Sequence, residues 1–197
     1  MKNIITISAP SGTGKTTLCK AVQEELKDIK WSVSVTTREK RKNEVDGVDY
    51  NFVKKDVFND LLKNKKFAEW EKVHGNYYGT LNESIENAIK TQGILLLELD
   101  VKGAMCLKKL YPKNSFTIFI IPPSLNHLRE RLKKRGTDSK KNIEIRLQRF
   151  EQEMNSKEYF DEIMINEDLE SAKLKLIDTI KKIKEGVKSG IKNDTIS

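Results

Sequence analysis

The chain has 197 residues, and 37 lysines and arginines against 29 aspartates and glutamates give a formal net charge of +8. With 37% hydrophobic residues it is too apolar for a disordered chain, and its apolar runs are far shorter than a membrane span. We therefore expect one soluble, compact domain. The first residues meet Pro10 and Gly12 too early to form a signal peptide, and Cys19 and Cys106 lack pairing or metal-ligand spacing. A cytoplasmic protein is the expectation.

The cations fall into two populations. A pI of about 9.3 alone would favour nucleic-acid binding, but the 30 lysines are spread over almost every segment. The seven arginines are confined to two stretches, near 38–41 and 129–149. Because arginine suits bidentate phosphate contacts, this clustering favours two phosphate-handling segments over one basic groove.

The hydrophobic pattern predicts strands and helices in alternation. Strands are expected at 4–8, 32–37, 94–100, 116–121 and, shorter, 162–166. Helices are expected after the glycine-rich turn that follows the first strand, then at about 82–91, 101–111, 124–135, 142–156 and 168–185. The continuous apolar runs are typical of strands buried on both faces. The pattern predicts an α/β fold with a mostly parallel sheet.

Two stretches interrupt this alternation. Residues 33–90 hold short polar alternating segments and a turn at His74-Gly75-Asn76, which predict a small inserted α+β unit. Residues 124–150 are charged and helical with a break at 136–141, which predicts a lid. The core is then expected at about 1–32, 91–123 and 151–190, and the polar end 188–197 is expected to be frayed.

A phosphate-binding loop is predicted between the first strand and the first helix. Its residues are Ala9, Pro10, Ser11, Gly12, Thr13, Gly14, Lys15 and Thr16, with Ala9 where the pattern has glycine. Small residues allow backbone N–H groups to surround an anion at a helix N-terminus. Lys15 would reach the β- and γ-phosphates, and the Thr16 hydroxyl would bind Mg²⁺. The alternative is an ordinary glycine-rich connection.

Asp100 closes the apolar run 94–99. The carboxyl end of a parallel strand is where a second acidic group of a nucleotide site is expected. Such a carboxylate would reach Mg²⁺ through a water molecule. The alternative role is an N-cap of the following helix, and the two roles are compatible.

Three segments carry a family resemblance: Ser34–Phe52, Phe67–Trp70 and Gly75–Thr80. With the loop at Ala9 and as far as Asn166, they make the chain resemble the guanylate kinase family, nucleoside monophosphate kinases with a P-loop NTPase fold. The resemblance implies that 33–90 is the GMP-binding domain. It implies that Arg38, Arg41, Tyr50 and Tyr78 hold the GMP phosphate, and that Ser34, Glu69, Thr80 and Asp100 read the guanine.

The residue types agree with those roles. Guanidinium and phenol groups are donors suited to a dianionic phosphate. The Glu69 carboxylate can accept from guanine N1–H and the exocyclic amine, while the Ser34 and Thr80 hydroxyls can donate to O6. Thr80 stands where the family usually has serine. Each residue taken singly has an ordinary alternative. Tyr50 and Tyr78 could be core aromatics, and Glu69, Arg38 and Arg41 could be solvated surface residues.

The resemblance also identifies the lid. Arg135 and Arg146 match arginines that close on the transferring phosphoryl group, whereas Arg129 and Arg149 fit an ordinary basic helix. Asn166 matches a position that contacts adenine, although an N-cap role is an equal alternative.

The activity so implied is Mg²⁺-dependent phosphoryl transfer from ATP to GMP, with dGMP as a second acceptor. Catalysis would need positioning and charge stabilisation, mainly by Lys15, Arg38, Arg135 and Arg146. No nucleic acid or membrane partner is expected, and the chain would be a monomer or homodimer. Three alternatives remain open: a kinase for another monophosphate, an inactive protein-binding module, and a nucleic-acid-binding protein.

Overall fold

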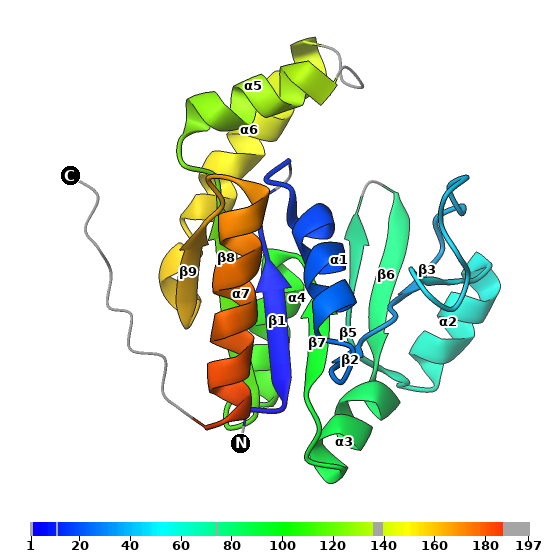
Figure 1. Cartoon of the computed structure of the whole chain (residues 1–197). Helices are drawn as coiled ribbons and strands as arrows, with labels where there is room; N and C mark the ends of the chain where they lie inside the picture. The colour runs from blue at the N-terminus through cyan, green and yellow to red at the C-terminus, as the bar shows by residue number, and fades with distance from the viewer. Residues whose placement is uncertain (1, 11, 74, 136–139, 187–197) are drawn as a thin grey trace.

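A five-stranded parallel sheet forms the centre of the molecule in a computed structural model that describes residues 2–10, 12–73, 75–135 and 140–186 (Figure 1). In spatial order the strands are β2 (Lys30–Trp31), β7 (Leu95–Glu98), β1 (Ile4–Ser8), β8 (Ser115–Ile121) and β9 (Glu162–Ile165). Each neighbouring pair is parallel. The α/β class predicted from the apolar runs is confirmed.

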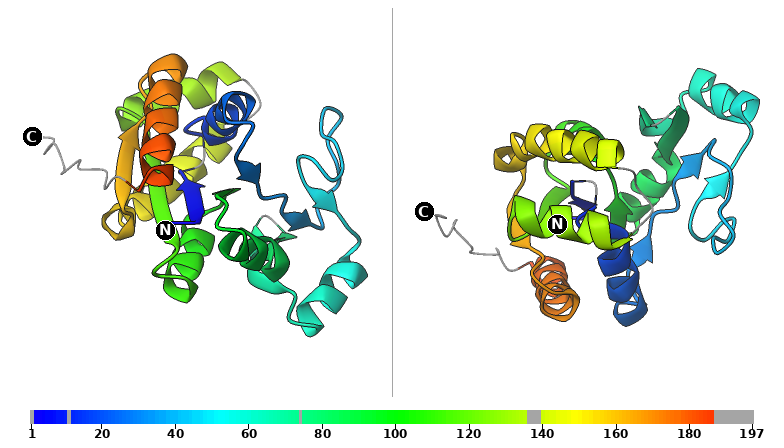
Figure 2. Two further views of the ribbon diagram at one scale, coloured as in Figure 1. Left: turned by 60° about the horizontal axis from the view of Figure 1, so that its bottom comes forward. Right: turned by 90° about the horizontal axis from the view of Figure 1, so that it is seen from above.

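Helices cover both faces of this sheet, as Figures 1 and 2 show. α1 (Lys15–Glu25) and α7 (Leu169–Lys184) pack on the face to which Ile5 and Ile7 point. α3 (Asn82–Lys90) and α4 (Val101–Leu110) pack on the face of Ile4. Successive residues of β1 thus enter different cores, which explains the absence of polar alternation in its sequence.

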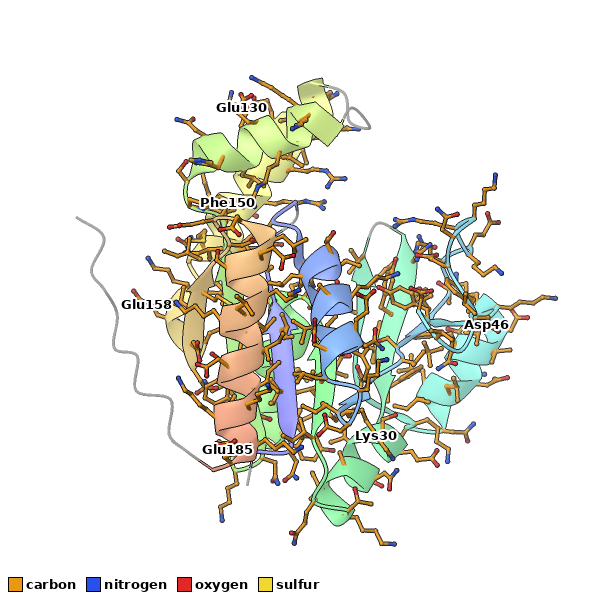
Figure 3. The ribbon with its side chains drawn as sticks, in the orientation of Figure 1. Lys30, Asp46, Glu130, Phe150, Glu158 and Glu185 are labelled. Atoms are coloured by element: carbon orange, nitrogen blue, oxygen red, sulfur yellow. The ribbon has the colours of Figure 1, made fainter. Side chains whose placement is uncertain are left out.

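A second, four-stranded sheet stands beside the first. Its order is β4 (Asn51–Phe52), β3 (Val35–Thr36), β6 (Asn76–Leu81) and β5 (Phe67–Val73), with β5 and β6 antiparallel. α2 (Lys55–Lys63) covers it through the fully buried Phe58, whose ring stacks on Phe67 at 4.5 Å between centroids. In Figure 3 Asp46 marks the edge of this unit farthest from the central sheet.

The segment predicted to be a lid consists of α5 (Leu125–Arg135) and α6 (Lys140–Met154), which lie over the end of β1 in the right-hand view of Figure 2. The two helices share a small apolar core of Leu128, Leu132, Ile143, Leu147 and Phe150. Phe150 lies at the base of the lid and Glu130 on its outer side in Figure 3. Of the break expected at 136–141, residues 140 and 141 already belong to α6, so that part of the prediction is wrong. Residues 136–139 and the tail 187–197 lie outside the described residues.

The expected single strand at 32–37 is wrong. The chain pairs with β7 as β2, and Ser32 still donates its N–H to the Leu96 carbonyl oxygen. It then crosses to the other sheet and pairs again as β3. Alternation of serine and valine indicated extended backbone but not the change of partner. Sequence analysis also missed α2 and a short 3₁₀ helix, Lys157–Tyr159, because both are short and largely polar.

Candidate functional site

The loop between β1 and α1 has the backbone of an anion site. Gly12 and Gly14 have positive φ angles of 92° and 88°, which glycine adopts without strain. Thr13 closes the turn, donating both its N–H and its hydroxyl to the Pro10 carbonyl oxygen. Ala9 is buried and is not among the described residues with positive φ. Alanine in place of glycine therefore imposes no strain there. Ser11 lies outside the described residues.

The end of β7 supplies the partners of the loop, because β7 is the direct neighbour of β1. The Lys15 ammonium donates to the Leu99 carbonyl oxygen at 2.8 Å and lies 3.8 Å from Glu98 Oε1. The Thr16 hydroxyl donates to the same Glu98 oxygen at 2.7 Å. Glu98 was not singled out from the sequence. The feature that could have identified it is a carboxylate as the last residue of an apolar strand.

Asp100 lies two residues beyond Glu98 and has a different partner. It is the N-cap of α4, and its Oδ1 accepts from the Gly103 N–H at 2.8 Å. The alternative N-cap role is confirmed. A hydroxyl next to a carboxylate is the oxygen-donor pair that Mg²⁺ accepts when substrate phosphates complete its sphere. Thr16 with Glu98 forms such a pair, so the residues present fit the ion.

A cavity of about 460 Å³ opens between α1 and the second sheet. Thr16 and Glu98 lie on its wall with Ser34, Arg38, Arg41, Tyr50 and Tyr78. Residues separated by up to about half the chain thus share one space. The fold brings together the residues expected to hold the GMP phosphate and the end of the phosphate loop.

Arg38 is held by Glu44 within that cavity. Its Nη1 and Nη2 donate to the two Glu44 oxygens at 3.0 and 2.7 Å, and Nη1 also donates to the Glu39 carbonyl oxygen. The Arg41 N–H donates to the same carboxylate. These hydrogen bonds lower the pKa of Glu44, and the bond from Arg38 makes the largest contribution. Tyr78 is a further side-chain hydrogen-bond partner of Arg38, so this guanidinium is held by several groups at once.

Two phenols complete this side of the cavity. The rings of Tyr50 and Tyr78 meet edge to face at 5.9 Å between centroids, and the Arg38 guanidinium lies 5.4 Å from the Tyr50 centroid. Burial raises the pKa of Tyr50 to about 12. The phenol therefore keeps its proton and remains a hydrogen-bond donor near neutral pH.

The residues expected to read guanine form a neighbouring cluster. Glu69 of β5 faces Thr80 of β6 across the ladder, and the Thr80 hydroxyl donates to Glu69 Oε1 at 2.5 Å. Glu69 is 8% exposed and Thr80 fully buried. Burial, with a smaller contribution from the charge of Asp100, raises the pKa of Glu69 to about 7. The Thr80 proton is thus already engaged by the carboxylate.

Of the two arginines predicted to act from the lid, only Arg146 has a side chain within the described part. Arg146 lies half-buried on α6, whereas Arg135 is the last residue of α5 and its side chain lies outside the described part. Arg131, to which sequence analysis gave no role, donates to the carbonyl oxygens of Asn166 and Glu167 at 3.0 and 2.9 Å. It also reaches the Thr13 carbonyl oxygen at 3.4 Å. The root of the lid is therefore fixed to the phosphate loop.

Asn166 lies between the loop and α7. Its Nδ2 donates to the Thr13 carbonyl oxygen at 2.8 Å, while its buried Oδ1 has no hydrogen-bond partner among the described residues. The N-cap of α7 is Asp168, so the N-cap alternative for Asn166 is wrong. An unpaired buried acceptor costs stability unless a ligand supplies the donor.

Comparisons with known proteins agree with this geometry. The family model described as guanylate kinase matches residues 1–183. The chain belongs to the guanylate kinase family. A guanylate kinase of Helicobacter pylori is 45% identical over 171 residues, covering 87% of this chain and 82% of the relative. One of Carboxydothermus hydrogenoformans is 41% identical over 169 residues, covering 86% and 82%.

A solved structure supports the same assignment. The crystal structure of guanylate kinase from Anaplasma phagocytophilum superposes with a TM-score of 0.75 at 30% identity, covering 92% of this chain and 85% of that one. Guanylate kinases are nucleoside monophosphate kinases that use ATP as phosphoryl donor. Within the described residues, every helix is too short or too polar to cross a membrane.

Proposed function

We propose that this protein transfers the γ-phosphoryl group of ATP to GMP, and to dGMP, in the presence of Mg²⁺. One observation carries the proposal. The Thr16 hydroxyl and the Glu98 carboxylate, at the end of the phosphate loop, line the same cavity as Arg38, Tyr50 and Tyr78. A donor phosphate on the loop and an acceptor phosphate on the arginine would thus face each other across one space. Such an arrangement suits in-line phosphoryl transfer.

On the donor side, the loop from Ala9 to Thr16 is proposed to bind the ATP phosphates through its backbone N–H groups. The Lys15 ammonium now lies on the Leu99 carbonyl oxygen, and it would turn to the β- and γ-phosphates when they arrive. Thr16 and Glu98 are proposed to hold Mg²⁺. When bound, the ion would neutralise phosphate charge during transfer.

On the acceptor side, Arg38, Arg41, Tyr50 and Tyr78 are proposed to hold the GMP phosphate. Glu44 binds both terminal nitrogens of Arg38 and would thereby orient this guanidinium toward the phosphate. An anionic phosphate oxygen needs no general base to attack the γ-phosphorus. Positioning and charge stabilisation therefore suffice.

The base would be selected by hydrogen-bond pairing. Glu69 is proposed to accept from guanine N1–H and the exocyclic amine, and Ser34 and Asp100 are proposed to contact the same base. Because Thr80 donates to Glu69, we propose that Thr80 acts chiefly by orienting that carboxylate. Adenine presents a different edge and would leave the buried Glu69 carboxylate without the two guanine donors.

The lid is proposed to complete the site. Arg135 and Arg146 would neutralise the equatorial oxygens of the transferring group on closure. The unpaired Asn166 Oδ1 would accept from the adenine amino group of ATP. The domain limits follow: 33–90 for acceptor binding, 124–150 for the lid, and the remainder for the donor. The protein would act in the cytoplasm as a monomer or homodimer.

The test is a coupled ADP-release assay with ATP, Mg²⁺ and GMP, dGMP, AMP, CMP or UMP as acceptors. We expect turnover with the guanine nucleotides and at least about 10²-fold lower kcat/KM with the others. Comparable activity on AMP, or no turnover with GMP, would contradict the proposal. The second outcome would favour an inactive binding module.

A further inference from the structure

Gly103, in the first turn of α4, lies against both acidic residues of the base-reading cluster. A Cβ atom at this position would lie 2.9 Å from Glu69 Oε2 and 3.3 Å from Asp100 Oδ1. The first distance is shorter than a carbon and a carboxylate oxygen tolerate without contact strain. The α4 helix thus approaches β5 so closely that only a hydrogen atom separates its backbone from the Glu69 carboxylate.

The backbone of Gly103 does not itself require glycine. Its φ is not in the left-handed region, unlike those of Gly12 and Gly14. Glycine in a helix is unfavourable relative to alanine because it has more backbone freedom to lose. Secondary structure therefore favours alanine here. The absence of a side chain has another cause, and the Glu69 carboxylate is the nearest group.

The same residue holds the second carboxylate directly. Its N–H donates to Asp100 Oδ1 at 2.8 Å, while Thr80 holds the other oxygen of Glu69. Glu69 is 8% exposed, so any shift of its carboxylate takes place within the protein interior. A methyl group at 103 would therefore displace the Glu69 carboxylate from its place beside Asp100.

We propose that Gly103 is a positioning residue for acceptor specificity: its N–H fixes Asp100, and its missing side chain leaves the space in which Glu69 meets the base. This inference rests on the proposed function, since it names the residue that positions Glu69 and Asp100 for recognition of the base. Gly103 contacts neither reacting phosphate. Its effect should appear in GMP binding and in base discrimination, and not in ATP binding.

The experiment is a double-mutant cycle of Gly103→Ala and Glu69→Ala, with KM for GMP and for ATP measured for each variant, and Tm by circular dichroism. Gly103→Ala is expected to keep or raise Tm, to raise KM for GMP about tenfold or more, and to leave KM for ATP within about twofold. In the Glu69→Ala background the same change should alter KM for GMP by less than about twofold. No carboxylate remains there to be displaced.

The matched control is Lys102→Ala, the preceding residue of α4, whose exposed ammonium lies 3.2 Å from Glu71. It should leave both KM values unchanged. An unaltered KM for GMP in Gly103→Ala, or an equal increase with and without Glu69, overturns the inference while the wild type still phosphorylates GMP. A wild type that does not use GMP overturns the proposed function as well. If the Tm of Gly103→Ala falls and the KM values for GMP and ATP rise together, Gly103 serves only the packing of α4 and the inference is overturned.

Discussion

The donor and acceptor halves of the site are built on different principles. The donor half is mainly backbone: a loop with positive φ at Gly12 and Gly14, followed by a helix N-terminus. The acceptor half consists of side chains from the second sheet and from the loop between β3 and β4. These are already paired with one another, Arg38 with Glu44 and Glu69 with Thr80. In the proposed function, triphosphate binding would thus depend on main-chain geometry, whereas recognition of the acceptor would depend on a preassembled side-chain network.

The difference has a consequence for perturbation. A side-chain change on the donor half should affect the chemical step and spare acceptor affinity. A change in the acceptor network should affect KM for GMP and spare ATP. Variants that change KM for GMP and KM for ATP equally would contradict this division between the donor and acceptor halves.

Lys15→Ala should have the largest effect. Without its ammonium the negative charge on the transferring phosphoryl group is less stabilised, and kcat should fall by about 10³-fold. The Tm should change little, because Lys15 makes one bond to a carbonyl oxygen, that of Leu99. Steady-state ADP release gives kcat, with Lys27→Ala, an exposed lysine after α1, as control. A loss below tenfold would remove Lys15 from the catalytic residues.

Arg146→Ala comes next. If α6 delivers this guanidinium to the phosphoryl group only on closure, kcat should fall by about 10²-fold while the affinity for GMP changes by less than about threefold. Kinetics and calorimetry with GMP separate the two quantities. Arg149→Ala, on the exposed side of the same helix, is the matched control. An unchanged kcat would show that Arg146 is not catalytic.

Glu44→Gln should have an intermediate effect on the acceptor half. The amide cannot accept both Arg38 donors, so the guanidinium loses its fixed orientation. KM for GMP should rise by about tenfold with KM for ATP unchanged. A lower KM for GMP would mean that the Glu44 carboxylate competes with the phosphate for Arg38. That outcome would reverse the role given to Glu44.

The pH dependence should be the smallest effect. The pKa of Glu69 is raised to about 7, so the carboxyl is mostly protonated below that pH and cannot accept from both guanine N–H groups. KM for GMP should therefore be about tenfold higher at pH 6 than at pH 8. The GMP phosphate titrates in the same range, and Glu69→Gln serves as the reference because it retains only that titration. Identical profiles for both proteins would contradict the assignment.

The donor half could be predicted from residues alone because its determinants are local. A strand, a glycine-rich loop and a helix follow one another in the sequence, and the described residues of the loop lie where the pattern places them. Glu98 could not be predicted in this way, because its hydrogen bond with Thr16 depends on β1 and β7 being neighbours in the sheet.

The acceptor half could not be derived in that way. Glu69 and Thr80 meet only through the β5–β6 register, with an irregularity next to Glu69. Sequence analysis reached these residues through the family resemblance. The roles of Arg131 and Gly103 depend on contacts between separate elements, and that of Glu44 depends on the path of the loop between β3 and β4. Neither the local pattern nor the resemblance indicated them.

The central claim is that Glu69 reads the acceptor base independently of ATP. Calorimetric titration of Glu69→Ala with GMP and, separately, with a non-hydrolysable ATP analogue tests it most directly. The account predicts at least about tenfold weaker binding of GMP, from the loss of hydrogen bonds to a charged acceptor, with ATP-analogue affinity unchanged within about twofold. Equal losses for both nucleotides, or undiminished GMP binding, would contradict it.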